Sequence, residues 1–388
     1  MDRLRIYSDR SHLPTGVPHV TMLDPFWGAA GRDADTRASF RLYRESGRDL
    51  FELVSIEEAE IAVLPYDWTY ATWEDAEFYP ATRDRALAFA DVAAGEGKPV
   101  VVFYETDLRQ RIPFKHLLFC TDLARSTRGF NQFALPGWSE DLLSKYRGGE
   151  VAIRAKQPRP TVGFCGYAPP VGMPLGLAKA KEVVRYTLGR TRVLRFVPVG
   201  SDPSPRIRAL RTPGPSARVR ALRALQRSGD VATNFIVRPY KTNAKGGRWK
   251  RPPDGRDVQR ASQLEYLDNM LGSDYILCSR GFGNFSYRFY ESLASGRIPV
   301  LIDTDCVLPF DFVIDWDRYC IRVPESEIRS IGARVAAFHA SISPSDFIDL
   351  QMTCRKLWEE WLSPEGFFAN FHRHLDVFKP SGADNRAI

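Results

Sequence analysis

The sequence predicts an α/β protein built from two domains, and three observations support this prediction. The chain has 388 residues, of which 44% are hydrophobic. Chains of this length usually form more than one hydrophobic core. Short apolar runs alternate with longer amphipathic segments, which is the pattern of βαβ units. A connector with proline and glycine at both ends (134–160) separates two such sets, so we expect two α/β domains facing a cleft.

Residues 1–150 are predicted to form the first α/β domain. Three apolar runs, each followed by polar or acidic residues, are predicted to be strands: 4–9, 59–67 and 98–107. Between the last two, the amphipathic segment TRDRALAFADVAAGEG (82–97) stops at glycine and is predicted to be a helix.

Residues 151–345 are predicted to form the second α/β domain, followed by a C-terminal helical tail over 346–388. Strands are predicted at 159–168, 192–200, 233–239, 273–279 and 297–303, and helices at 175–189, 219–229 and 286–296. From about Pro324 onward, the pattern becomes mostly helical.

The formal net charge of +7 is a mild excess for this length. It suits a phosphate-bearing substrate and weak, peripheral contact with an anionic membrane surface. A nucleic-acid binder would concentrate its charge in a stripe, whereas the basic clusters here are short and scattered, so no nucleic-acid partner is expected.

The six cysteines form no CxxC pair, and several lie inside apolar runs, so they are predicted to be buried free thiols in a reducing compartment. The N-terminus has no apolar segment of signal-peptide length, and no apolar run approaches about 18 residues. We therefore expect a cytoplasmic protein, with the inner face of the membrane as an alternative location.

The stretch SRGFGNFSYRFYESLASGRIPVLID begins at Ser279 and joins a buried strand to a helix through a glycine-rich turn (280–284). Gly281 and Gly283 allow a tight turn and close approach of a ligand, and Ser286 is predicted to cap the helix. A strand, a glycine-rich turn and a helix N-terminus together make an anion site, to which Arg280 could add a bidentate contact.

Two side chains on the predicted helix extend this site. Arg288 and Glu291 are three positions apart and share one face. Glu291 lies one turn beyond the anion site, where its carboxylate could accept hydrogen bonds from the ribose hydroxyls of a nucleotide. Taken alone, such a pair is more often a solvated ion pair, and a GxG turn often closes a loop without binding anything.

The segment from Tyr266 to Phe310 closely resembles the signature of the exostosin-like glycosyltransferases (glycosyltransferase family 47). The matching residues are Tyr266, Ser273, Cys278, Arg280, Gly281, Ser286, Arg288, Glu291, Gly296, Ile298, Pro299, Val300, Leu308, Pro309 and Phe310. Weaker similarities extend the resemblance over most of residues 58–330. Ser279 and Arg297 depart from it, because the family usually has Pro and Cys there, and these departures put substrate details in doubt.

The resemblance implies a GT-B fold: two Rossmann-like domains, of which the C-terminal one binds a nucleotide-sugar donor, UDP- or GDP-linked, and the N-terminal one faces the acceptor. It implies an inverting transfer of a hexosyl or pentosyl unit to an oligosaccharide or lipid-linked glycan. For a bacterial-type member, surface polysaccharide synthesis is the expected role. The donor-binding candidates are Arg238, Arg280, Gly281, Gly283, Ser286, Arg288 and Glu291. The basic loop with Lys245, Arg248 and Lys250 could close over the donor or be a solvated charge run.

A base for the acceptor hydroxyl is expected from the N-terminal half. Asp107 and Asp67 each follow a predicted strand, and His12 lies in a polar loop after the first strand. We rank Asp107 first, Asp67 second and His12 third, although each could instead be a helix cap or a loop hydrogen-bonding residue. The aromatic residues Trp68, Tyr70 and Trp73 could stack on acceptor sugars or belong to the core.

No cofactor is required by this design, because arginines and helix dipoles can carry the charge of the leaving group. The DTDC segment (303–306) resembles a DxD metal motif only superficially, so metal ligation is not expected, although a divalent metal stays an alternative. A Rossmann dehydrogenase would need GxGxxG in its first βα turn, and GFCGYAPPVG is a poor substitute. The other rival is a GT-B protein that binds glycans or nucleotides without catalysis.

Overall fold

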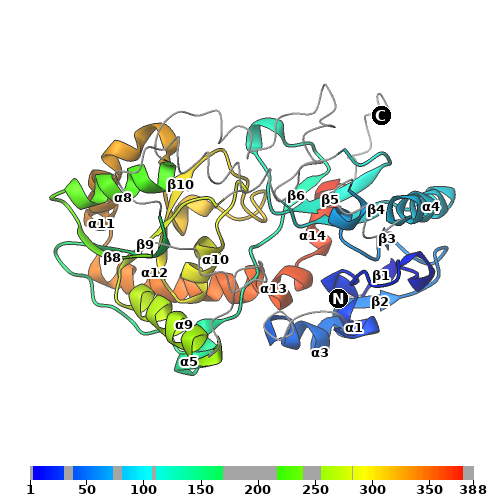
Figure 1. Cartoon of the computed structure of the whole chain (residues 1–388), viewed down its shortest axis with the longest axis horizontal. Coiled ribbons are helices and arrows are strands. Elements are labelled where there is room, and N and C mark those ends of the chain that lie inside the picture. The colour runs from blue at the N-terminus through cyan, green and yellow to red at the C-terminus, as the bar shows by residue number, and fades with distance from the viewer. Residues whose placement is uncertain are drawn as a thin grey trace.

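The computed structural model of the chain describes residues 3–29, 38–72, 81–106, 111–168, 216–238, 255–281 and 283–378. Its strands form two separate parallel sheets, which lie side by side in Figure 1. The first sheet has the order β2-β1-β3-β4-β5-β6. Its strands are β1 (Leu4–Tyr7), β2 (Phe51–Leu53), β3 (Ile61–Val63), β4 (Val100–Tyr104), β5 (His116–Cys120) and β6 (Gln132–Ala134).

The second sheet has the order β11-β10-β9-β7-β8 among the described strands. These are β7 (Thr161–Tyr167), β8 (Ala232–Arg238), β9 (Tyr275–Cys278), β10 (Ile298–Asp303) and β11 (Ile321–Pro324). The central strands are buried apolar runs, as expected for a sheet covered on both faces; β4, for example, reads VVVFY and is buried throughout.

Helices connect and cover the strands (Figure 1). Their bounds are α1 (Asp24–Trp27), α3 (Arg41–Leu50), α4 (Thr82–Gly95), α5 (Leu142–Arg147), α8 (Ala217–Arg227), α9 (Gly255–Leu271), α10 (Tyr287–Ala294), α11 (Ile331–Ser341), α12 (Pro344–Leu357), α13 (Pro364–Ala369) and α14 (His372–Phe378). Local sequence fixes several ends: α12 begins with a capping box between Ser343 and Asp346 and has proline in its first turn.

The predicted α/β class, with two Rossmann-like halves in a GT-B arrangement, is confirmed by the two parallel sheets. The six cysteines are free and buried, as predicted. The predicted connector is not wholly irregular, because it contains α5. The helix predicted at 175–189 and the strand predicted at 192–200 lie outside the described residues. The domain boundaries near residues 150 and 345 stay predictions.

Each sheet has a topological switch point, which is a strand from which the chain connections lead to opposite sides of the sheet. In the first sheet, β2 and β3 lie on opposite sides of β1. In the second sheet, β8 and β9 lie on opposite sides of β7. Ligands of open α/β sheets bind at the carboxyl edge beside such a switch point, so these two edges are where functional side chains should be sought.

The C-terminal helices return to the first sheet, as Figure 1 shows for α13 and α14. The ring of Phe368 in α13 stacks on Tyr43 of α3 with 4.1 Å between centroids. Beyond it, Phe371 stacks on Phe119 of β5 at 4.9 Å. Trp138 Nε1 donates a hydrogen bond of 3.1 Å to Leu362 O just before α13. The tail is therefore part of the core beneath the first sheet.

His374 in α14 lies within this aromatic core and is completely buried. Its ring lies 4.6 Å from Phe310, 4.9 Å from Phe133 and 5.0 Å from Phe119, measured between centroids. Burial lowers the pKa of His374 to about 3, because the apolar surroundings disfavour the imidazolium.

We expect this histidine to make the folded state sensitive to acid. In the unfolded chain, histidine titrates near about 6.5, so the unfolded state gains the proton first as pH falls. The stabilisation is fully present above that pH and is lost progressively toward pH 3, by up to about 1.4 kcal/mol per pH unit. Urea unfolding between pH 7.5 and 4 should show a shallower pH dependence for His374→Leu than for the wild type. Equal slopes in the wild type and His374→Leu would contradict the assignment.

Candidate active site

The glycine-rich turn lies at the carboxyl edge of β9 and leads into α10. Ser286 occupies the N-cap position of α10, as predicted, but its side chain makes no capping hydrogen bond. Gly281 N–H donates to Phe285 O at 3.2 Å, and a Cβ at Gly281 would meet no atom within 4 Å. The turn is therefore open on the side of Gly281, where a ligand could approach the backbone closely.

One amide of the turn is held by the first half of the molecule. Asn284 N–H donates to Asp122 Oδ1 at 2.9 Å, and both residues are buried. Since the N–H groups of Gly281 and Asn284 already have acceptors, the expectation that the turn offers its amides to an anion does not extend to these two. Phe282 lies outside the described residues, and Gly283 is buried.

Arg288 lies at the switch point of the second sheet. Its Nη2 donates a hydrogen bond of 2.7 Å to Cys165 O near the end of β7, and its guanidinium lies 4.4 Å from the centre of the Phe164 ring. Its Nε is buried and has no hydrogen-bond acceptor among the described residues. At Gly166, a Cβ would stand 2.6 Å from Arg288 Nη2, so glycine is what leaves room for the guanidinium.

Glu291 accepts a hydrogen bond from the Tyr266 hydroxyl, and the guanidinium of Arg288 lies 5.7 Å from the Tyr266 ring. No direct ion pair joins Arg288 to Glu291 within the described ranges, so the solvated-pair alternative is not what the structure shows. Burial and the charge of Glu291 raise the pKa of Tyr266, which stays a hydrogen-bond donor. Burial alone would lower the pKa of Arg288, but Tyr266 and Glu291 are among the neighbours that raise it. Arg288 is thus held in its charged form.

Arg218 in the first turn of α8 is a site residue that the sequence reasoning missed. Its Nε donates to Ser279 Oγ at 2.9 Å, Nη1 to Tyr167 O at 3.0 Å and Nη2 to Arg280 O at 3.1 Å. It thereby ties the end of β7 to the start of the glycine-rich turn. Ser279, which replaces the usual proline of the family, supplies the hydroxyl that accepts this bond.

Arg218 and Arg288 approach the same aromatic ring, at 6.0 Å and 4.4 Å from the centre of Phe164. Burial, and next the charge of Arg288, lower the pKa of Arg218 to about 10, so both guanidinium groups are cationic at neutral pH. Two half-buried cations beside the same ring repel each other, and a bound anion would relieve this cost. The switch point of the second sheet is therefore positively charged.

The remaining donor candidates are placed differently. Arg280 and Ser286 line a small cavity between the glycine-rich turn and the end of β10, together with Asn284 and Thr304. Arg238 ends β8, but its guanidinium bonds Ser262 and Glu265 of α9 and its side chain is only 13% exposed. Its proposed phosphate contact stays a prediction. Lys245, Arg248 and Lys250 lie outside the described residues.

Asp67 follows β3 at the switch-point edge of the first sheet. Its Oδ1 accepts from Thr69 N and its Oδ2 from Glu105 N, each at 2.8 Å. Burial raises the pKa of Asp67 to about 7, and the negative charge of Glu105 adds to this increase. Near neutral pH this carboxyl can therefore take up or release a proton, which is the property of a general base.

The structure places some of the other candidate bases and aromatic residues predicted for the first half, and others lie outside the described residues. His12 follows β1, and its Nδ1 lies 3.3 Å from Arg85 O while its ring meets Phe89 edge-on. Trp68 is 1% exposed and packs against Phe114, so it belongs to the core, whereas Tyr70 is half-buried. Asp107 and Trp73 lie outside the described residues.

The carboxyl edges of the two sheets meet directly. Ala124, after β5, forms an antiparallel bridge with Cys306, after β10. Arg125 pairs with Asp303 at 2.8 Å and approaches Asp305 at 3.8 Å. The acidic DTDC segment thus binds an arginine of the other half. Among the described residues, no group of three or more His, Cys, Asp or Glu side chains is placed to hold a metal ion.

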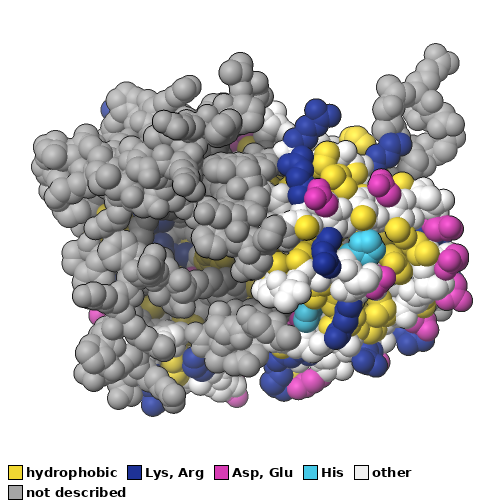
Figure 2. Space-filling model, turned by 45° about the vertical axis from the view of Figure 1, so that its right-hand side comes forward, with side chains coloured by type: hydrophobic (Ala, Val, Ile, Leu, Met, Phe, Trp, Pro, Cys, Tyr) yellow, Lys and Arg dark blue, Asp and Glu magenta, His cyan; other side chains and the backbone are white. Residues whose placement is uncertain are grey.

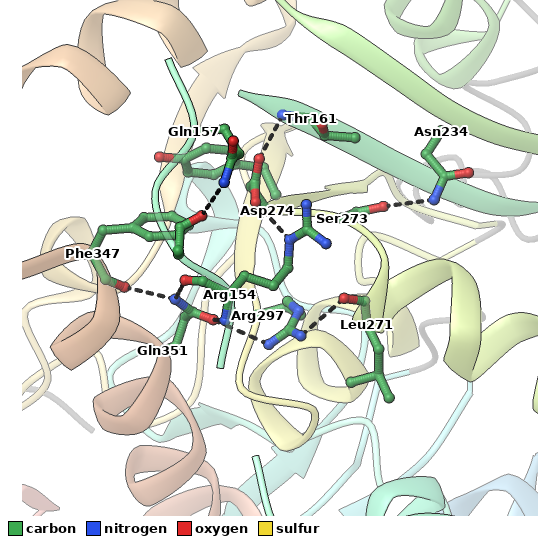
Figure 3. A network of polar contacts seen from close by, with 12 residues as sticks. Arg154, Gln157, Thr161, Asn234, Leu271, Ser273, Asp274, Arg297, Phe347 and Gln351 are labelled. Atoms are coloured by element: carbon green, nitrogen blue, oxygen red, sulfur yellow. Dashed lines mark hydrogen bonds and ion pairs between the residues drawn. The ribbon is translucent and has the colours of Figure 1, made fainter. Parts of the chain in front are cut away.

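Arg297, the second departure from the family pattern, lies in the interior of the second half. Figure 3 shows its guanidinium beside Leu271 and Gln351, within a network that also contains Arg154 and Asp274. Arg297 is fully buried and also donates to Ala152 O and Gly296 O. All of its hydrogen-bond partners among the described residues belong to this internal network, so the departure concerns the stability of the fold rather than the substrate.

The described part of the face drawn in Figure 2 shows no sorting of side chains by type. On the face in Figure 2, Lys and Arg side chains lie interspersed with Asp, Glu and hydrophobic ones. None of the described helices is both long enough and apolar enough to span a bilayer.

Two parallel α/β halves with facing carboxyl edges, and with arginines at the switch point of the second, define the GT-B class of protein. Residues 223–338 match the family described as "Exostosin GT47 domain". The predicted resemblance to this family is therefore confirmed over residues 223–338. The match includes Arg288 and Glu291, and it begins just after Arg218.

The relatives are similar over short stretches. "Exostosin-1 homolog" of Caenorhabditis elegans is 38% identical over 76 residues, which are 20% of each chain. "Exostosin-1" of Drosophila melanogaster is 30% identical over 119 residues, 30% of this chain and 15% of that protein. A "Probable glucuronosyltransferase" of Oryza sativa subsp. japonica is 31% identical over 91 residues, 23% of this chain and 21% of that protein. The matches thus span about a fifth or less of these relatives.

Among solved structures, the catalytic domain of starch synthase IV from Arabidopsis thaliana is similar with a TM-score of 0.31 and 12% identity. The similarity covers 88% of this chain and 76% of that one. A likeness at this level supports no inference about function, and the fold assignment rests on the strand pairings.

Proposed function

We propose that this chain is a glycosyltransferase that moves a sugar from a nucleoside-diphosphate donor to a hydroxyl group of a glycan acceptor. The observation that carries the proposal is the convergence of Arg218, Arg288 and Glu291 at the switch point of the second sheet. Arg288 and Glu291 lie within the exostosin GT47 match, which begins just after Arg218. The Nε of Arg288 has no acceptor among the described residues, which suits a site for an anion.

The chemistry that this site would supply follows from its charges. The acceptor oxygen attacks the anomeric carbon, a new C–O bond forms, and the bond to the diphosphate oxygen breaks. The guanidinium groups of Arg218 and Arg288 stabilise the charge of the departing diphosphate. Glu291 accepts the ribose hydroxyls, and the proton of the acceptor hydroxyl passes to a carboxylate of the first half. Inversion at the anomeric carbon follows from a single displacement of this kind.

Glu291→Ala is expected to weaken donor binding by at least about tenfold. Hydrogen bonds to a charged acceptor contribute roughly 1.5–3 kcal/mol, and about 1.4 kcal/mol corresponds to a factor of ten. UDP- and GDP-linked sugars would be screened by thermal stabilisation, and the dissociation constants of wild type and variant would then be compared for the donor that binds. Glu291→Gln should fall between them because it keeps one acceptor oxygen.

Glu96→Ala removes an exposed glutamate after α4 and serves as the matched control, with donor affinity expected to equal that of the wild type. If Glu291→Ala bound the donor as tightly as the wild type, the ribose assignment would be wrong. If no UDP- or GDP-linked sugar bound the wild type, the proposed donor class would itself be excluded.

The alternative function is a GT-B protein that binds the nucleotide or glycan without catalysis. Turnover separates the two, because a transferase releases nucleoside diphosphate whereas a binding protein only holds the donor. The raised pKa of Asp67 favours the enzyme, since a carboxyl that ionises near neutral pH suits proton transfer. A role in surface polysaccharide synthesis and independence from divalent metal remain our predictions, and adding EDTA to the turnover assay tests the latter.

A further inference from the structure

Asp122 is a buried carboxylate that stands in the first half of the molecule but acts on the second. It follows β5 and is 2% exposed, and its Oδ1 accepts the N–H of Asn284 at 2.9 Å. Asn284 lies in the glycine-rich turn and is 6% exposed. A buried carboxylate destabilises the fold unless its hydrogen bonds compensate for the loss of water. The contact with Asn284 is therefore expected to have a specific role.

The surrounding contacts hold Asn284 in one orientation. Its side-chain Oδ1 accepts the hydroxyl hydrogen of Thr304 at 2.6 Å, and Thr304 follows β10. Beside it, Val307 N donates to Leu123 O at 3.0 Å, and Arg125 N donates to Asp305 O at 2.9 Å. The segment that carries Asp122 is therefore joined to the second half by backbone hydrogen bonds, which fix the carboxylate relative to the turn.

We propose that Asp122 is a positioning residue for the donor site: by fixing the N–H of Asn284, it holds the glycine-rich turn in the conformation that receives the donor. This inference rests on the proposed function. Asp122 acts through the turn and does not touch the donor itself. Because of this link, the acceptor-side half helps to fix the geometry of the donor site. The donor site is therefore complete only when the two halves are in contact.

The test compares three variants of the full chain. Asp122→Ala removes the acceptor, Asp122→Asn keeps an acceptor oxygen without the charge, and Asp311→Asn breaks the 2.6 Å ion pair between Arg128 and Asp311. This ion pair crosses the same contact between the halves but leaves the turn untouched. Binding of UDP, GDP and their sugar conjugates would be measured by calorimetry, and KM for donor and for acceptor, kcat and the midpoint of thermal unfolding would be recorded for each variant.

We expect Asp122→Ala to weaken donor binding and raise the donor KM by on the order of tenfold, because an unpaired buried amide lets the turn relax. The acceptor KM should stay within about twofold. Asp122→Asn should recover most of the donor affinity, and Asp311→Asn should match the wild type. A role confined to overall stability would move the unfolding midpoint without separating the two KM values.

Two results would overturn the inference: unchanged donor affinity in Asp122→Ala, or an equal loss in Asp122→Ala and Asp311→Asn, which would indicate general loosening of the contact. Should Asp122→Ala fail to fold, Asp122→Ser takes its place, because serine keeps a polar group in the buried space but is too short to reach Asn284 N. Failure of the proposed function can be told apart from failure of this inference, because the wild type itself would then bind none of the nucleotides. In that case the inference would fail together with the proposed function.

Discussion

Asp67→Asn is expected to lower kcat by roughly 10²–10⁴-fold while leaving donor affinity unchanged, because general-base catalysis contributes about that factor. The amide keeps one of the two acceptor oxygens that hold Thr69 N and Glu105 N, so the fold around β3 should persist. Nucleoside diphosphate release under saturating donor and acceptor measures kcat, and calorimetry measures donor binding. Asp67→Ala, which loses both acceptors, should be equally inactive and less stable.

The pH dependence of the wild type gives this assignment a second test. A base must be ionised to accept a proton, and burial places the pKa of Asp67 at about 7. We therefore expect kcat to rise with pH through the neutral range and then level off. Glu105→Gln removes a negative charge that raises this pKa, so the midpoint should move to lower pH. Activity retained in Asp67→Asn but lost in Asp107→Asn or His12→Gln would transfer the role of base to that residue.

Arg297→Ala is expected to lower the free energy of unfolding by more than about 4 kcal/mol, which is among the largest effects of single substitutions. The guanidinium donates to the carbonyl oxygens of Met270, Leu271 and Ala152 at 3.2, 3.0 and 2.7 Å. Each buried acceptor left unsatisfied costs roughly 1–3 kcal/mol, and the truncated side chain leaves a cavity besides. Urea unfolding at pH 7 measures the loss.

The matched control is Arg147→Ala, on the surface beside α9. Arg147 pairs with Asp268 while its own side chain is 45% exposed, and exposed pairs contribute about 0–1 kcal/mol. Arg297→Lys should be intermediate, because an ammonium group cannot reproduce the planar fork of donors. A loss below about 1 kcal/mol in Arg297→Ala would show that the network is not needed for the fold.

The strands that the sequence predicted best are those whose apolar runs end in a polar residue. Examples are β4 and β10, where periodicity and length agree with a fully buried parallel strand. Strands β2, β5, β6 and β11 were not predicted. Two of them, β2 and β6, have only three residues each, so their apolar pattern is weak. The start of the helix after Ser286 was predicted correctly from local sequence, although the serine side chain makes no capping hydrogen bond.

The parts of the candidate site that escaped prediction are held by contacts between distant segments. Arg218 bonds Ser279 and Asp122 bonds Asn284, yet neither arginine nor aspartate has a local signal that distinguishes it from many others. Arg238 shows the converse, since its place at the end of β8 was predicted while its partners on α9 were not. Side-chain partners across the fold depend on packing geometry, which one sequence without an alignment does not reveal.

The return of α13 and α14 to the first sheet has a consequence for how the protein is made. Tyr43 and Phe119 are synthesised long before Phe368 and Phe371, the rings that cover them. Contacts between such remote positions form slowly and leave apolar surface exposed in the meantime. We therefore expect nascent chains truncated before α13 to be recognised by chaperones, and the N-terminal half to become protease-resistant only after the last helices emerge.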